Sequence, residues 1–108
     1  MRLDPGGENG MPKYVIHRRF DIDLDTMPEM GRRSRQIIEE DMPEITWHHS
    51  HVTVDGSGMV HSFCVYDAPN EEAIHVHSRS LGHHVIDELY EIAGDVTPED
   101  FPPIDVPG

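Results

Sequence analysis

Apolar and polar positions follow a strand-like pattern in four segments of the chain and a helix-like pattern in two. Tyr14, Ile16 and Phe20 share one parity, which predicts a strand over residues 14–20. The runs 45–54, 59–66 and 85–93 are rich in β-branched and aromatic residues and predict three more strands. In residues 26–41 and 70–82 the apolar positions recur at the spacing of one helix face.

Both predicted helices carry start and stop signals. Thr26 and Glu29 have the spacing of a capping box, and Pro43 ends this helix at or just after Asp41. Asn70 is the predicted N-cap of the second helix, which stops near Gly82. The core-facing residues are expected to be Met30, Ser34, Ile37, Ile38 and Asp41 on the first helix, and Ala73, Ile74, His77 and Leu81 on the second.

The predicted element order is βαββαβ. Its natural closure is an α+β, ferredoxin-like sandwich, with a four-stranded antiparallel sheet, two helices on one face, and the spatial strand order fourth, first, third, second. We expect residues 13–94 to form this domain. Residues 1–12 are polar and contain glycine and proline, which predicts a disordered leader, and residues 95–108 predict an acidic, proline-rich tail.

The central hairpin decides which side chains share a face of the sheet. A four-residue turn at 55–58 makes Val54 face Met59, so that His49 faces Cys64 and His51 faces Ser62. The helix-covered side then holds Ser50, Val52, Val54, Met59, Phe63 and Val65, and the open side holds Trp47, His49, His51, Cys64 and Tyr66.

The first strand adds a histidine to the predicted open face. If Tyr14, Ile16 and Phe20 point into the core, then His17 points to the opposite side. This face assignment predicts a row of His17, Cys64 and His49 across three strands, with His51 two positions along. Facing side chains on neighbouring strands lie about 5 Å apart at Cβ, which is close enough to share an ion.

Aromatic side chains on that open face predict an assembly. Trp47 and Tyr66 would form an aromatic surface that a soluble monomer rarely leaves in water. We therefore expect a homodimer that packs open face to open face and encloses the histidine row in a barrel-like cavity. The alternative is that the C-terminal tail covers the face.

Composition favours a metal as partner and argues against polyanions. The chain has nine histidines, three of them at His48, His49 and His51, and histidine is the commonest side-chain metal ligand. Its net charge is −13, and residues 13–94 alone hold seven basic and fifteen acidic side chains. Such a field repels nucleic acid and anionic membranes. No apolar run spans a bilayer, no signal peptide is visible, and one cysteine forms no intrachain disulfide, so we expect a cytoplasmic protein.

The other histidines divide by position. His77 lies on the apolar side of the second helix, as a hydrogen-bonded core residue or as part of a second metal position with His75, His83 and His84. His83 and His84 follow the helix end, where an imidazolium charge is favourable. His48 and His61 alternate away from the predicted row and receive no role.

Several segments together resemble a known family. They are 11–16 (MPKYVI), 47–53 (WHHSHVT), 63–66 (FCVY), 68–69 (AP), 71–74 (EEAI) and His77. The chain is similar over about residues 11–94 to a small family, long classed as a domain of unknown function, whose described member binds nickel and forms a dimer of ferredoxin-like folds. The resemblance implies that fold, a dimer and nickel, with His49, Cys64 and His77 at positions of the family pattern. His17 stands where the resemblance implies Glu, His51 where it implies Tyr, and His83-His84 where it implies an aromatic-Pro pair.

We therefore predict a binding protein for divalent transition metals that stores, buffers or traffics the ion. The predicted ligands are His17, His49 and His51, then Cys64, with His77 from a second position. Imidazole and thiolate favour nickel, zinc or copper over magnesium or calcium, and binding should weaken as pH falls through about 6.5.

Two alternatives stay open. The first is a small dimeric-barrel enzyme with a histidine-lined cavity, either metal-dependent or cofactor-free; the chain has no Ser-His-Asp order, Gly-rich phosphate loop or Cys-x-x-Cys pair to support it. The second is an interaction module whose histidines respond to pH.

Overall fold

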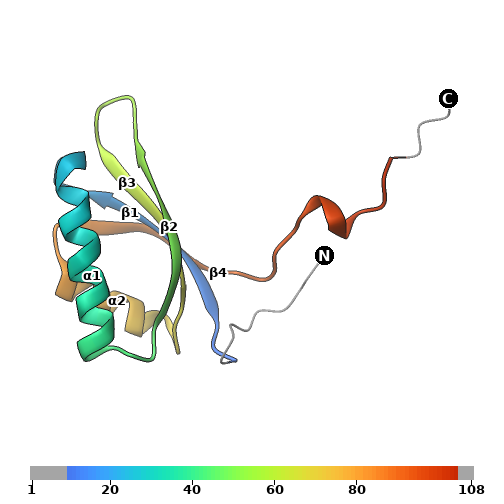
Figure 1. Ribbon diagram of the computed structural model, residues 1–108, viewed down its shortest axis with the longest axis horizontal. Helices are drawn as coiled ribbons and strands as arrows, with labels where there is room; N and C mark the ends of the chain where they lie inside the picture. Colours follow the sequence, from blue (N-terminus) through green and yellow to red (C-terminus); the bar gives the residue numbers. More distant parts are fainter. Residues whose placement is uncertain (1–9, 105–108) are drawn as a thin grey trace.

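A computed structural model describes residues 10–104 as an α+β domain in which two helices pack on one side of a four-stranded antiparallel sheet (Figure 1). The strands are β1 (Lys13–Phe20), β2 (Thr46–Val54), β3 (Val60–Asp67) and β4 (His84–Glu91). The helices are α1 (Met27–Asp41) and α2 (Glu71–Leu81), with short 3₁₀ helices η1 (Leu24–Thr26) and η2 (Pro98–Asp100). All four strands and both helices predicted from the sequence are present, with ends shifted by one or two residues. None of the described helices is long and apolar enough to cross a membrane.

The predicted leader and tail fall largely outside the described residues. Residues 1–9 of the leader predicted at 1–12, and residues 105–108 of the tail predicted at 95–108, lie beyond them. The described part of the tail leads away from the sheet and does not cross its uncovered face (Figure 1).

The strand order is β2-β3-β1-β4, which is fourth, first, third and second when it is read from the other edge. Every neighbouring pair is antiparallel. In β1 the side chains at 14, 16, 18 and 20 are buried and those at 15, 17 and 19 are less so, which agrees with the predicted faces of this strand.

The register of the central hairpin differs from the prediction by one residue. Val54 faces Val60 and not Met59, because the turn has five residues, 55–59. The amide of Gly58 donates to the carbonyl of Asp55, and Gly58 adopts a φ of 88°, a left-handed conformation that glycine accepts without strain. A type I turn followed by one left-handed glycine adds this extra residue to a hairpin.

Because of this one-residue difference, the side chains of β3 lie on the faces of the sheet opposite to those predicted. Val60, Ser62, Cys64 and Tyr66 are buried against the helices, whereas Phe63 lies on the open side and is 37 % exposed. The predicted row of His17, Cys64 and His49 is therefore wrong. The observed row across the open face is His51, Phe63, His17 and Glu88.

A bulge corrects the register at the start of β2. The pairing shifts between Trp47 and His49, so that Trp47 faces Tyr66 as predicted and His48 is the extra residue. The Trp47 and Tyr66 rings meet edge to face with centroids 6.1 Å apart, and Tyr66 is only 1 % exposed. These two aromatic residues thus belong to the helix side, and they no longer supply a reason for dimerisation through the open face.

The helix termini follow the sequence signals in three of four cases. Asn70 accepts a hydrogen bond from the amide of Ala73 at 2.9 Å, Gly82 ends α2, and α1 ends at Asp41. Thr26, the predicted cap of α1, makes no side-chain cap. The reason is that η1 runs directly into α1 and holds Thr26 at helical angles, φ −88° and ψ −13°, whereas a capping residue is usually extended.

Candidate metal centre

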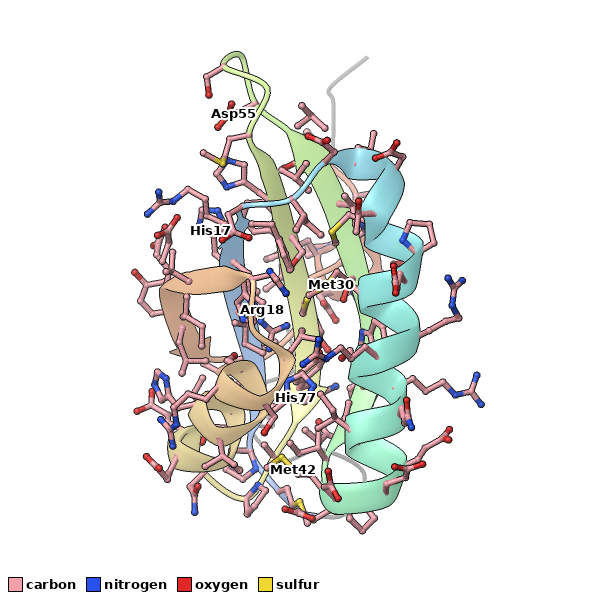
Figure 2. All side chains as sticks on the ribbon, turned by 90° about the vertical axis from the view of Figure 1, so that its left-hand side faces the viewer. His17, Arg18, Met30, Met42, Asp55 and His77 are labelled. Atoms are coloured by element: carbon pink, nitrogen blue, oxygen red, sulfur yellow. The ribbon has the colours of Figure 1, made fainter. Side chains whose placement is uncertain are left out.

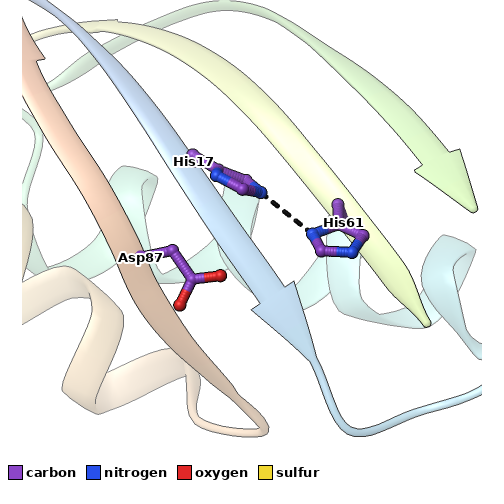
Figure 3. Close-up of side chains that lie close together, drawn as sticks. All are labelled: His17, His61 and Asp87. Carbon is purple, nitrogen blue, oxygen red and sulfur yellow. Dashed lines mark hydrogen bonds between the residues drawn. The ribbon is translucent and has the colours of Figure 1, made fainter. Parts of the chain in front are cut away.

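Two histidine rings meet on the uncovered face of the sheet. His17 on β1 and His61 on β3 approach so that His17 Nε2 lies 2.9 Å from His61 Nδ1 (Figure 3). The His17 ring also stacks on Phe63, with centroids 4.4 Å apart and planes 11° apart. Because both strands are central in the sheet and the rings are half-buried, their positions are well defined by packing.

Each ring has a carboxylate near its second nitrogen. His61 Nε2 lies 2.7 Å from Asp55 Oδ2, and His17 Nδ1 lies 3.6 Å from Glu88 Oε1. Carboxylates at the far nitrogen of metal-binding histidines fix the tautomer and orient the ring. Asp55 is itself held by the hairpin turn, since its Oδ1 accepts from the amides of Ser57 and Met59.

A third possible ligand comes from β4. Asp87 is the extra residue of a bulge, because His17 faces Glu88 while Arg18 faces Ile86. One ligand atom from each of His17, His61 and Asp87 lies within 4.8 Å of the other two. Figure 3 shows the three side chains on adjacent strands of one face.

The electrostatics of this group are acidic with one competing cation. Arg19 donates to both oxygens of Asp87, from Nε at 3.1 Å and from Nη2 at 3.2 Å, and this pair lowers the pKa of Asp87. Hydrogen bonds from Ser57 and then from His61 lower the pKa of Asp55 still further. Both carboxylates are therefore ionised at neutral pH, as metal binding requires.

His49 and His51 lie on the same open face but apart from this group. Their rings touch edge to face with centroids 5.4 Å apart, and both side chains are exposed on the edge strand β2. His51 is separated from His17 by Phe63 on the intervening strand. Since neighbouring strands lie about 4.8 Å apart, the two backbones are roughly 10 Å apart at this row.

Cys64 and His77 are not brought together with His17. They lie on the helix side, in a buried group around Arg18, whose Nη1 is 3.2 Å from Cys64 Sγ and whose Nη2 is 3.4 Å from His77 Nδ1. His77 Nε2 also lies 3.0 Å from Ser34 Oγ. Burial, and then the nearby Arg18 guanidinium, lower the pKa of His77 to about 4, so His77 is the hydrogen-bonded core histidine that the sequence offered as one interpretation.

The remaining histidines lie outside the group. His48 Nε2 is 2.9 Å from Asp67 Oδ2, a carboxylate that is fully buried. His75 is exposed on α2, and His83 lies 3.7 Å from Asp21. His84 Nδ1 is 2.7 Å from the carbonyl of Gly82, and burial lowers its pKa, which opposes the imidazolium role expected at the helix end.

Sequence reasoning missed two of the three grouped residues. His61 was assigned to the wrong face with the rest of β3, and the five-residue turn around Gly58 was the signal that would have corrected it. Asp87 lies beside the two histidines because of a bulge in β4, and the sequence of β4 has no pattern that predicts a bulge.

Comparison with known proteins gives one family. The family described as "Nickel responsive protein SCO4226-like" matches residues 14–92, which is most of the chain and all of the sheet except its first residue. No curated protein matches, and no solved structure matches.

Proposed function

The chain belongs to the SCO4226-like family of nickel-responsive proteins, and we propose that it binds a late divalent transition metal, nickel first, on the open face of its sheet. We further propose that His17, His61 and Asp87 provide the ligands. The observation that carries this proposal is the 2.9 Å contact between the two imidazoles, each with a carboxylate beyond it.

The contact between the rings is hard to satisfy while both imidazoles are neutral and no ion lies between them. If each ring donates its far N–H to its carboxylate, then two lone pairs face each other across 2.9 Å. If His17 Nε2 instead donates to His61, then His17 Nδ1 is a buried acceptor with no donor, facing Glu88. An ion bound to the two near nitrogens removes the conflict, because both far nitrogens are then free to donate to carboxylates.

The donor set fits late transition metals. Imidazole nitrogens favour nickel, copper and zinc, whereas magnesium and calcium prefer a shell of oxygens. Two nitrogens at about 2.0–2.1 Å from one ion are about 2.9 Å apart at a right angle and about 3.4 Å apart at the tetrahedral angle. The contact of 2.9 Å therefore needs little movement to hold an ion of square-planar or octahedral preference.

Cys64 and His77 are left out of this proposed ligand set. The Arg18 guanidinium lies against both of them, and a fixed positive charge opposes a metal ion. We propose His49 and His51 as a weaker, separate donor pair on the exposed edge of the same face.

We also propose that the fold is the ferredoxin-like sandwich and that two copies pair through their open faces. The reason is now Phe63, which is exposed beside the histidines and which a second copy would cover. A metal site at such an interface suits storage, buffering or trafficking, since ion loading and assembly would be linked.

The test is metal content and nickel titration calorimetry on protein purified without an affinity tag. We expect about one nickel per chain at the main site, and a loss of roughly a hundredfold in affinity in the double variant His17→Gln/His61→Gln, because two imidazole ligands are removed. The matched control is His75→Gln/His83→Gln, which removes the same number of histidines from exposed positions elsewhere. Unchanged affinity and stoichiometry in the His17/His61 variant would contradict the proposed ligands.

A second double variant distinguishes between the two donor groups. His49→Gln/His51→Gln should leave the main site intact and remove only weaker binding. Loss of the main site in this variant would show that the edge pair provides the ligands. Sedimentation with and without nickel measures the dimer, and a monomer under both conditions would contradict the assembly.

A further inference from the structure

A cavity of about 620 Å³ opens between α1 and the edge strand β2, on the side of the sheet opposite the candidate metal centre. It lies between two groups of core residues, one around Tyr66 and Ile38 and the other around Phe20 and Met30. Val52, on the helix-facing side of β2, lines it and is 46 % exposed, so α1 does not cover this part of the sheet. Cavities of 300 to about 1,000 Å³ are the usual size of small-molecule sites.

The inner end of the cavity holds a buried guanidinium. Arg18 is 1 % exposed and lines the cavity from β1, on the helix side of the sheet (Figure 2). No ion pair within residues 10–104 involves Arg18. Its Nε has no hydrogen-bond partner in that range.

The partners of Arg18 include no carboxylate: they are four hydrogen-bonding atoms and the ring of Tyr66, whose centroid is 5.1 Å from Arg18 Cζ. Nη1 is 3.2 Å from Cys64 Sγ and 3.3 Å from Tyr66 Oη, and Nη2 is 3.4 Å from both His77 Nδ1 and Ser78 Oγ. Charge-assisted bonds from arginine to a carboxylate are shorter, about 2.7–2.9 Å, and stronger. A buried charge is costly without such a partner, so the site is short of an anion.

The residues that line the cavity indicate the chemistry of the remainder of the ligand. Leu24, Met27, Met30, Trp47 and Val52 present apolar surface, while hydroxyls from Ser34, Ser62 and Tyr66 gather near the guanidinium. The cavity thus suits a ligand that has one polar end and an apolar body. A doubly charged phosphate would suit the guanidinium but not these walls.

We propose that this cavity binds a small amphipathic monocarboxylate, with its carboxylate on Arg18 and its hydrocarbon chain between α1 and β2. This binding site uses neither His17 nor His61, although His49 of the weaker donor pair also lines the cavity.

The chain supplies its own reporter for a test. Trp47 is the only tryptophan and lines the cavity, so its fluorescence follows occupancy. Decanoate, below its micelle concentration and near neutral pH, is titrated into the full-length chain by fluorescence and calorimetry. We expect saturable binding of one decanoate per chain. 1-Decanol should bind at least roughly tenfold more weakly, because it cannot make the charged hydrogen bonds. Inorganic phosphate should not compete.

Two variants locate the ligand. Arg18→Gln removes the charge, and Gly31→Leu fills the cavity from α1, where an added Cβ meets no atom within 4 Å. Each should weaken decanoate binding at least roughly tenfold, by loss of the charged contact or of the space. Gln36→Leu adds the same side chain on the exposed side of α1 and should change nothing.

The proposal is overturned by any one of these results: no saturable decanoate binding, equal binding of 1-decanol, competition by phosphate at equal strength, or full binding by Gly31→Leu. Full binding by a folded Arg18→Gln has the same meaning. If Arg18→Gln does not fold, then the comparison with 1-decanol and the Gly31→Leu variant decide the matter.

Discussion

Replacing His77 by glutamine is expected to remove part of the acid sensitivity of the fold. His77 is fully buried on α2, between Ser34 and the Arg18 guanidinium (Figure 2). Burial and Arg18 lower its pKa from 6.5 to about 4. Glutamine preserves a hydrogen-bonding side chain at this position but does not titrate.

The direction in which stability changes with pH follows from the pH at which each state binds a proton on His77. The unfolded chain protonates His77 below pH 6.5, whereas the folded domain resists protonation until about pH 4. Stability is therefore at its full value above pH 6.5 and falls as pH decreases toward 4, because only the unfolded state gains a proton. At 1.36 kcal/mol per pH unit, the loss between pH 7.5 and pH 5 is about 2 kcal/mol. That is a large share of the 5–15 kcal/mol that roughly describes small domains.

Urea unfolding at several pH values between 5 and 7.5 measures the effect. The quantity that matters is the difference in unfolding free energy between wild type and His77→Gln, because groups that do not interact with His77 titrate alike in both proteins and cancel. This difference should shrink by about 2 kcal/mol as pH falls across the range. In His75→Gln, which replaces an exposed histidine on the same helix, the unfolding free energy should change with pH as it does in the wild type. Parallel behaviour of His77→Gln as well would refute the reasoning that His77 stays neutral in the fold.

Two further predictions concern the neighbours of the candidate metal centre. Arg19→Gln frees Asp87 from its ion pair and removes a cation, so nickel should bind several-fold more tightly by calorimetry. Affinity that does not rise would contradict the view that Arg19 competes with nickel for Asp87. Asp55→Asn should weaken nickel binding roughly 10–100-fold, while circular dichroism shows the fold intact. The reason is that the turn amides still donate to the asparagine oxygen, which directs the side-chain amide group at His61 Nε2. The proton of His61 then moves to Nδ1, the proposed ligand atom, and unchanged affinity would exclude this orienting role.

The fold was predictable because its signals are local, and the candidate site was not because it depends on register. The parity of Tyr14, Ile16 and Phe20 placed His17 on the open face correctly. The same parity includes Arg18, which is buried although an arginine is ordinarily expected in water, so residue type alone does not predict its burial. A rule that gives every residue of one parity the same face would have identified it.

The central hairpin shows how a small error grows. One extra residue in the turn, at left-handed Gly58, transferred Cys64 and Tyr66 to the core and His61 to the open face. Strand side chains alternate with a period of two, so a slip of one residue inverts a whole strand. The bulge that adds Asp87 to the group has no sequence signal of comparable strength.

Strand β1 connects the two proposed sites, since His17 and Arg18 are successive residues that point to opposite faces of the sheet. A site for a cation and a site for an anion need surroundings of opposite charge, and a single surface would set the two in conflict. The alternation of one strand separates them: a carboxylate of β4 lies beside His17 and one of the hairpin turn beside its neighbour His61, while no carboxylate contacts Arg18. The bulge opposite this same pair of residues lets β4 add Asp87 to the open face while Ile86 stays packed on the core. The register of β1 is thus the feature on which both chemistries depend, and a slip there would bury the imidazole and expose the guanidinium.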